Sequence, residues 1–202
     1  MYSKKIYLVR HGETDYNKNK IVQGGTIDAN LNDTGKNQAD QFYSAFKNEG
    51  FDHIFTSTLQ RTHQSVIKFI NSGLPWEQHK GLNEISWGKY DGTPLFENQY
   101  YWDMVEQWKK GETNLNVESG ESPQDVYNRQ NLVIEKIKQV NCDKLLICMH
   151  GRAMRILLCN LLELPLVNMD NFKHSNLGLY IISYDGISFR IEKKNYTKHL
   201  DS

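Results

Sequence analysis

The sequence has few cysteines and no long apolar run. Cys142, Cys148 and Cys159 form no Cys-x-x-Cys pair and no even set, which suits a reducing compartment. The longest apolar stretches, near 145–149 and 156–162, fall far short of the ~20 residues that span a membrane. The short apolar run near the N-terminus cannot form the core of a signal peptide. We therefore expect a cytoplasmic protein without a membrane partner.

The sequence also has no excess of positive or of negative charge. Lys and Arg number 24, Asp and Glu number 24, and the formal net charge of the 202 residues is zero. Proteins that bind nucleic acid usually carry a basic excess, so this partner is not expected. Any anion binding must come from a local cluster. Apolar residues make up 39 % of the chain, which is enough for a core and argues against disorder.

Strand-like and helix-like segments alternate along the chain, a pattern typical of a layered α/β fold. The predicted strands are 6–9, 53–56, 145–149, 179–184 and 188–193, the last two joined by a turn at Asp185-Gly186. The predicted helices are 34–47, 59–71, 95–110, 123–140 and 151–162. Asn32 or Thr34 can cap the first helix, and Ser57 or Thr58 the second. We expect one domain over residues 1–202.

Two predicted strands run directly into a His-Gly pair, at His11-Gly12 and at His150-Gly151. Ligands of α/β sheets bind beyond the carboxyl ends of the strands, so both histidines should reach one crevice. A glycine after each histidine lets a ligand approach the backbone, and the helix after His150 offers free N–H groups to an anion. Arg10 adds N–H donors suited to phosphate oxygens. The two junctions predict an anion site.

Further motifs lie at the first junction and between the two junctions, in a fixed order. The chain has Arg-His-Gly-Glu-Thr at 10–14, Ser-x-Leu-x-Arg at 57–61, Leu-x-Glu-x-x-x-Gly at 82–88 and Gly-Glu-Ser at 120–122. Single matches are Asn17, Gln23, Gly24, Asp28, Leu31, Gly35, Gln38, Gln64, Asp125, Arg129 and Arg155. This order resembles the histidine phosphatase superfamily, also called phosphoglycerate mutase-like. Asn30 replaces the usual proline before Leu31, a departure that removes no reactive group.

The resemblance implies a three-layer α/β/α sandwich with a mostly parallel central sheet and a small helical cap insertion at about 93–120. It implies a two-step phosphoryl transfer through phosphohistidine on His11, because neutral imidazole is a competent nucleophile near pH 7. Arg10, Arg61 and His150 would surround the phosphoryl oxygens. Glu84 would be the general acid and then the base, which requires a raised pKa for its first role.

The resemblance also implies which groups contact the ligand. Asn17, Gln23, Gly24 and Gly151 would bind substrate or phosphate, with Thr14 a weaker candidate. No metal and no cofactor are implied, and the partner would be a small phosphorylated metabolite. A homodimer stays open as the oligomeric state.

Several residues have alternative interpretations. Glu13, Glu118 and Glu121 are other carboxylates near these motifs, so they compete with Glu84. Cys148 lies two residues before His150, which suggests thiol or zinc chemistry, yet a buried unpaired cysteine is commoner. The remaining arginines near the motifs fall into two groups. Arg129 and Arg155 are expected to form ion pairs that brace the fold, whereas Arg152 lines the pocket or faces water.

The branch of the superfamily is indicated by residues 84–92. Cofactor-dependent phosphoglycerate mutases have Arg-x-Tyr-Gly after the acid, whereas this stretch reads Glu-Ile-Ser-Trp-Gly-Lys-Tyr-Asp-Gly without an arginine. The phosphatase branch is therefore favoured, with a mutase as the alternative and a non-catalytic phosphate-binding protein as a remoter one. Aromatic residues crowd 96–108; they either cap the crevice over the substrate or only fasten a helix to the core.

Overall fold

The computed structural model describes residues 3–201 and contains one six-stranded sheet of order β3-β2-β4-β1-β5-β6. Its strands are β1 (Lys4–Arg10), β2 (His53–Thr56), β3 (Trp76–Gln78), β4 (Lys144–Met149), β5 (Leu179–Tyr184) and β6 (Phe189–Tyr196). Strands β3, β2, β4 and β1 are mutually parallel. Strand β5 is antiparallel to both β1 and β6. The prediction of a mostly parallel sheet is confirmed.

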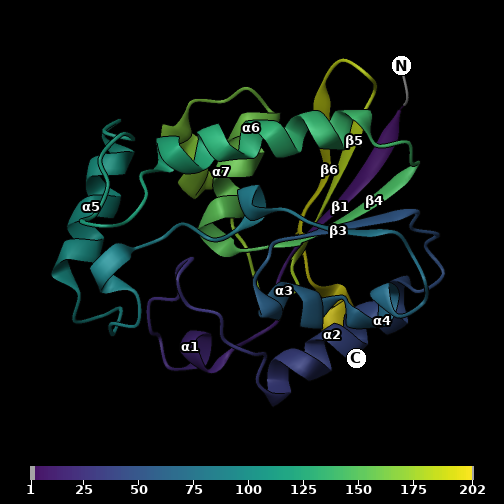
Figure 1. Cartoon of the computed structure of the whole chain (residues 1–202), viewed down its shortest axis with the longest axis horizontal. Coiled ribbons are helices and arrows are strands. Elements are labelled where there is room, and N and C mark those ends of the chain that lie inside the picture. The colour runs from purple at the N-terminus through teal and green to yellow at the C-terminus, as the bar shows by residue number, and fades with distance from the viewer. Residues whose placement is uncertain (1–2, 202) are drawn as a thin grey trace.

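Helices cover both faces of the sheet. The α-helices are α1 (Asp15–Lys18), α2 (Asp33–Phe46), α3 (Gln60–Ser65), α4 (Ile67–Ile70), α5 (Gln99–Lys109), α6 (Pro123–Gln139) and α7 (Gly151–Leu161). The 3-10 helices are η1 (Lys80–Leu82), η2 (Gly88–Tyr90), η3 (Leu166–Asn171) and η4 (Lys198–Leu200). Figure 1 shows α6 and α7 on one side of the sheet and α2, α3 and α4 on the other. Across residues 3–201 none of the helices has the length and apolarity needed to cross a membrane.

The three layers follow from the pleat of the buried strands, in which successive side chains point to opposite faces. Ile6 and Leu8 are fully buried in a core cluster that includes residues of α6 and α7. Tyr7 and Val9 belong to a second cluster, which includes Phe42 of α2. Apolar residues at consecutive positions thus build a core on each face, and the predicted α/β/α sandwich is confirmed.

Local elements differ from the prediction in the second helix. The expected helix 59–71 is divided into α3 and α4 at Val66, whose φ of −124° and ψ of 17° are not helical. The N-cap of α3 is Leu59 without a side-chain cap bond, so the predicted caps Ser57 and Thr58 are wrong. Instead, Oδ1 of Asp28 accepts the N–H of Gln60 at 2.7 Å. The side chain from another loop replaces the local cap.

Other local signals are confirmed. Asn32 is the N-cap of α2 and accepts the N–H of Gly35 at 2.9 Å. Gly186 has a φ of +95° in the turn between β5 and β6, a conformation that favours glycine. In contrast, the strand β3 was not predicted, because it is only three residues long and none of them is fully buried.

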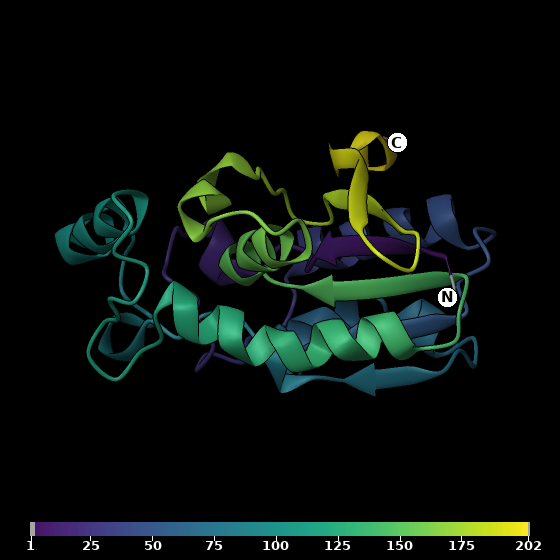
Figure 2. The same ribbon diagram turned by 90° about the horizontal axis from the view of Figure 1, so that it is seen from above.

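The segment expected as a cap contains α5 and lies at one end of the molecule. Figure 2 shows α5 beyond the end of the sheet toward which β1 and β4 run. The buried face of α5 includes Met104, Val105 and Trp108. The rings of Trp87 and Trp108 are 5.1 Å apart, so the helix is fastened to the loop that follows Glu84. The segment therefore lies over the carboxyl ends of the parallel strands.

Candidate active site

His11 directly follows β1 and is held in one tautomer. Its backbone N–H donates to the carbonyl of Met149 at 2.9 Å, which joins the ends of β1 and β4. Its Nδ1 lies 2.7 Å from the carbonyl oxygen of Gly12; since a carbonyl only accepts, Nδ1 carries the hydrogen and Nε2 keeps a lone pair. Burial, and then the charges of Arg61 and Arg10, hold the pKa of His11 well below its usual range. The ring is neutral and suited to nucleophilic attack.

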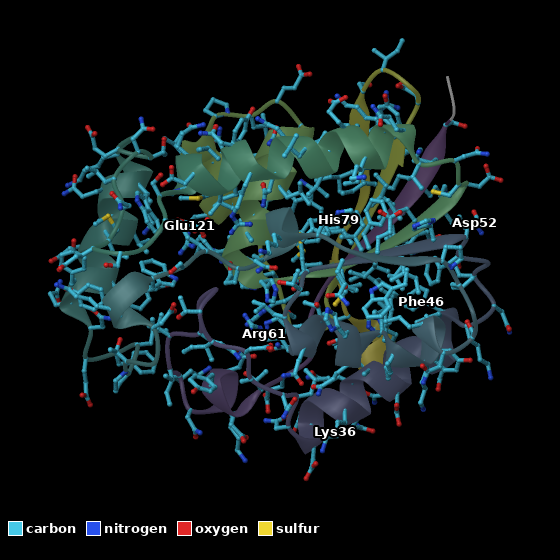
Figure 3. All side chains as sticks on the ribbon, in the orientation of Figure 1. Lys36, Phe46, Asp52, Arg61, His79 and Glu121 are labelled. Carbon is cyan, nitrogen blue, oxygen red and sulfur yellow. The ribbon has the colours of Figure 1, made fainter. Side chains whose placement is uncertain are left out.

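His150 and Arg61 lie beside His11. The rings of His11 and His150 are 5.2 Å apart, so the two His-Gly junctions meet as expected. Arg61 is completely buried, and its Nε donates to Nδ1 of His150 at 3.1 Å. Figure 3 labels Arg61 near α3, away from the outer edge of the molecule. Nε2 of His150 lies 2.8 Å from Oγ of Ser57. Burial and the nearby Arg61 lower the pKa of His150, so His150 is neutral and both its nitrogens are engaged.

A cavity of about 470 Å³ opens in front of His11. Of the predicted site residues, its lining includes Arg10, His11, Asn17, Gln23, Glu84 and Gly151. The predicted residues outside the lining are Thr14, Gly24, Arg61 and His150. Six of the predicted residues thus line the cavity, and the other four lie behind its lining.

Among the predicted site residues that line the cavity, two have a buried donor without a partner within residues 3–201. Nη1 of Arg10 lies 3.2 Å from Nδ1 of His174, but the buried Nε of Arg10 has no hydrogen-bond partner there. The buried Nε2 of Gln23 also lacks one in the same range. Burial lowers the pKa of Arg10 to about 10, which shows how little solvent stabilises its charge. A buried N–H donor without a partner destabilises the protein. These two groups are therefore suited to donate hydrogen bonds to a bound oxyanion.

Thr14 and Asn17 hold Gln23 in place. Thr14 is fully buried, caps α1, and donates from Oγ1 to Oε1 of Gln23 at 2.8 Å. Nδ2 of Asn17 donates to the same oxygen of Gln23 at 3.5 Å, and Oδ1 of Asn17 accepts from Nδ2 of Asn176 at 3.2 Å. The bond to Thr14 uses the oxygen of the Gln23 amide and leaves its nitrogen free. Thr14 therefore orients a lining residue and is not itself exposed to the cavity.

Glu84 lies at the N-terminus of α7. Its Oε1 accepts the N–H groups of Ile85 at 3.0 Å and Ala153 at 2.8 Å, and its Oε2 accepts that of Arg152 at 3.0 Å. The N–H groups predicted to bind a ligand anion are therefore partly taken by a carboxylate of the protein, which corrects that expectation. The carboxylate is fixed in one orientation.

The competing carboxylates are placed elsewhere. Oε1 of Glu13 accepts from Asn32, Glu118 pairs with Lys89, and Glu121 pairs with Arg129. None of the three lines the cavity around His11 among the described residues. Glu84 alone of these four carboxylates has the position that proton transfer at this cavity requires.

Arg129 braces the backbone that carries Glu84. It donates to the carbonyl oxygens of Gly81 at 2.7 Å, Asn83 at 2.9 Å and Glu84 at 3.1 Å, and it pairs with Glu121 at 2.7 Å. Several bonds from one planar guanidinium fix a loop that has little regular structure. The prediction that Arg129 forms a bracing ion pair is confirmed.

Gly12 and Gly24 both make close contacts within the protein. A Cβ on Gly12 would lie 2.7 Å from the carbonyl oxygen of Gly35, so a glycine is required by this backbone contact. Gly12 is not in the lining of the cavity, so the expected ligand approach at this glycine is not seen. The N–H of Gly24 donates to Oδ1 of Asp91 at 2.7 Å. That amide is engaged within the protein. Gly151 differs, because it lines the cavity beside the ring of His174.

Sequence reasoning missed His174 and Asp170, which also line the cavity. Burial, and then the charges of Arg10 and Arg155, lower the pKa of His174 to about 2, so its ring is neutral and its Nδ1 accepts from Arg10. Both residues follow α7, Asp170 in the 3-10 helix η3 and His174 in the connection from η3 to β5, and neither belongs to one of the motifs. Their only signal in the sequence is their place before the strand β5.

Cys148 has no chemical role in this arrangement. It is fully buried in the core, and burial raises the pKa of its thiol. Within residues 3–201, His, Cys, Asp and Glu side chains form no group of three that could hold a metal ion. Cys148 is thus a core residue beside the site.

Two tryptophans of α5 test what the aromatic segment does. Trp102 lines the cavity and is 41 % exposed, whereas Trp108 is completely buried. We expect Trp108→Ala to lower the free energy of unfolding by about 3–5 kcal/mol, as for other buried aromatics. Trp102→Ala should change it by less than about 1.5 kcal/mol but alter the ranking of phosphate ester substrates by kcat/KM. Denaturant unfolding and a substrate panel measure both; an unchanged ranking would leave Trp102 without a role in substrate choice.

Comparisons with known proteins agree with this geometry. Residues 6–197 match the histidine phosphatase superfamily (branch 1). "Putative phosphoserine phosphatase 2" of Hydrogenobacter thermophilus is 26 % identical over 91 % of each chain, and "Probable phosphoglycerate mutase GpmB" of Yersinia pestis is 29 % identical over 98 % of this chain and 95 % of its own. A solved structure of a phosphoserine phosphatase variant from Entamoeba histolytica with phosphoserine is 26 % identical, with a TM-score of 0.83 over 98 % of this chain and 99 % of its own. The chain belongs to the histidine phosphatase superfamily.

Proposed function

We propose that this protein hydrolyses small phosphomonoesters through a phosphohistidine on His11, without a metal ion. One observation carries the proposal: the Nδ1 hydrogen of His11 is bound to the carbonyl of Gly12 at 2.7 Å, which leaves Nε2 free beside the cavity. Unpartnered donors of Arg10 and Gln23 and the carboxylate of Glu84 share that cavity. Nucleophile, oxyanion donors and a proton carrier are the parts that phosphoryl transfer needs.

In the first step, Nε2 of His11 attacks phosphorus in line with the ester oxygen. Arg10 and Gln23 donate to the equatorial oxygens, and the charge of the buried Arg61 supports them from behind. The P–O bond breaks, and the leaving alkoxide takes a proton from Glu84. In the second step, water gives a proton to Glu84 and attacks the phosphohistidine. Phosphate leaves, His11 is neutral again, and Glu84 holds the proton for the next cycle.

A phosphatase is favoured over a mutase because residues 85–90 contain no arginine next to the proposed acid. Two of the relatives above bear phosphoserine phosphatase names, which points the same way. A cofactor-dependent mutase remains the second candidate, since the third relative bears a phosphoglycerate mutase name and the cavity contains further cationic residues.

Phosphorus NMR distinguishes these functions. The protein is incubated in EDTA with 3-phosphoglycerate and simple alkyl phosphates, with and without 2,3-bisphosphoglycerate. Inorganic phosphate without 2-phosphoglycerate is the expected result. Formation of 2-phosphoglycerate that depends on the bisphosphate would make the protein a mutase. Absence of both products, together with no acid-labile phosphate on the protein, would indicate a non-catalytic phosphate-binding protein.

A further inference from the structure

The cavity in front of His11 contains a second charged cluster. Arg152 and Arg155 come from α7, and Asp170 comes from η3. Nη1 of Arg152 donates to Oδ1 of Asp170 at 2.6 Å, and Nη1 of Arg155 donates to the same oxygen. One carboxylate oxygen therefore serves two guanidinium groups, and the three charges leave one positive charge in excess.

Some polar atoms of this cluster lack a hydrogen-bond partner within the described residues. Nε of Arg155 and Oδ2 of Asp170 are buried without a hydrogen-bond partner in the described part of the chain. The side chain of Arg152 is only 10 % exposed, and it lies over the ring of Trp108 with 5.7 Å between the guanidinium carbon and the ring centroid. Burial and the charge of Arg152 lower the pKa of Arg155. A buried cation that is only partly compensated is stabilised by an added anion.

His174 connects this cluster with the phosphoryl end of the cavity. Its Nδ1 contacts Arg10, and the charges of Arg10, Arg155 and Arg152 all act on its ring. Although the chain has no net charge, the cavity is lined by more cations than carboxylates. The cations are Arg10, Lys109, Arg152 and Arg155, and the carboxylates are Glu84 and Asp170. The excess of positive charge in the lining is therefore larger than Arg10 and Glu84, the charged residues near His11, account for.

We propose that Arg152 and Arg155 form an anion subsite that binds a carboxylate of the substrate while its phosphoryl group faces His11. The single excess charge of the cluster matches a carboxylate better than a second phosphate dianion, and a planar guanidinium suits carboxylate oxygens. Asp170 holds the two guanidinium groups in place. The preferred substrates are then phosphomonoesters of small hydroxy or amino acids. This inference rests on the proposed phosphatase function and names its substrate class.

The test uses substrates that differ at one group. 3-Phosphoglycerate and glycerol 3-phosphate differ by a carboxylate in place of a hydroxymethyl group. We expect the wild-type protein to favour 3-phosphoglycerate by about 10- to 100-fold in kcat/KM, the value of a charge-assisted contact. Arg155→Gln should reduce this ratio to about threefold or less, because kcat/KM should fall much further for 3-phosphoglycerate than for glycerol 3-phosphate. Arg152→Gln should act in the same direction.

Controls separate binding from folding and from the function itself. Lys138→Gln, an exposed change on α6, should leave the ratio unchanged, and Arg155→Lys should restore part of it if charge matters. A wild-type ratio near 1 would overturn the subsite, and so would a bisphosphate ester of glycerol that is preferred over 3-phosphoglycerate.

A direct binding measurement keeps the subsite distinct from the proposed function. Calorimetry on His11→Ala with the same two ligands does not depend on turnover. Tighter binding of 3-phosphoglycerate that Arg155→Gln removes would support the subsite even if the wild-type protein hydrolysed nothing. Equal affinities would overturn the subsite even if hydrolysis were fast.

Discussion

His11→Ala is expected to lower kcat for every phosphomonoester by about 10⁶-fold, the scale seen when a nucleophile is removed from an organised site. His150 lies close to His11, but its nitrogens are engaged by Arg61 and Ser57, so it offers no replacement lone pair. The cavity donors of Arg10 and Gln23 remain in the variant. We therefore expect the affinity for inorganic phosphate, measured by calorimetry, to change by less than about tenfold.

Trapping of the phosphoenzyme makes this test specific. Wild-type protein quenched during turnover of a labelled ester should carry acid-labile phosphate, and His11→Ala should carry none. His53→Ala is a matched control, since His53 is a partly buried histidine on β2 that pairs with Glu77 away from the cavity. It should keep full activity and labelling. Acid-labile phosphate on the His11→Ala protein would assign the nucleophile to another residue.

The position of His11 could be predicted because local and global signals agree there. The apolar runs of β1 and β4 have to be buried, and in a parallel sheet the residues that follow them emerge at the same edge. Arg10, His11 and His150 therefore meet although the sequence separates the two junctions widely. Helix ends with local caps, such as Asn32, are predictable for the same reason: their partners lie within a few residues.

The remaining features depend on contacts between segments without a local pattern. The sequence marks Glu84 as a candidate acid, but its three backbone donors come from its own loop and from α7. Likewise, Asp170 of η3 and His174 of the connection to β5 both line the cavity, and neither residue belongs to a motif. Gly12 shows the opposite error, because its motif suggests ligand contact whereas the backbone of Gly35 requires the glycine.

Glu84→Gln should separate the two steps of the proposed reaction. An alkyl ester leaves as an alkoxide that needs a proton, so loss of the acid should lower the rate of phosphohistidine formation by about 10²–10⁴-fold. Nitrophenolate leaves without a proton, so the burst of nitrophenolate from p-nitrophenyl phosphate should slow by less than about tenfold. The steady-state rate with that ester should still fall, because the second step needs Glu84 as a base.

The amide that Glu84→Gln introduces also changes the hydrogen bonding, and this needs its own control. Both oxygens of Glu84 accept backbone N–H groups, whereas an amide offers one oxygen and turns its NH₂ toward a donor. Glu121→Gln weakens the brace that Arg129 provides to the same loop without touching the cavity. If Glu121→Gln only displaces the loop that carries Glu84, it should slow the reactions of the alkyl ester and of p-nitrophenyl phosphate equally. If Glu84→Gln also slows the alkyl ester and the nitrophenolate burst equally, Glu84 is not the general acid, and its carboxylate serves only to fix the N-terminus of α7 beside His11.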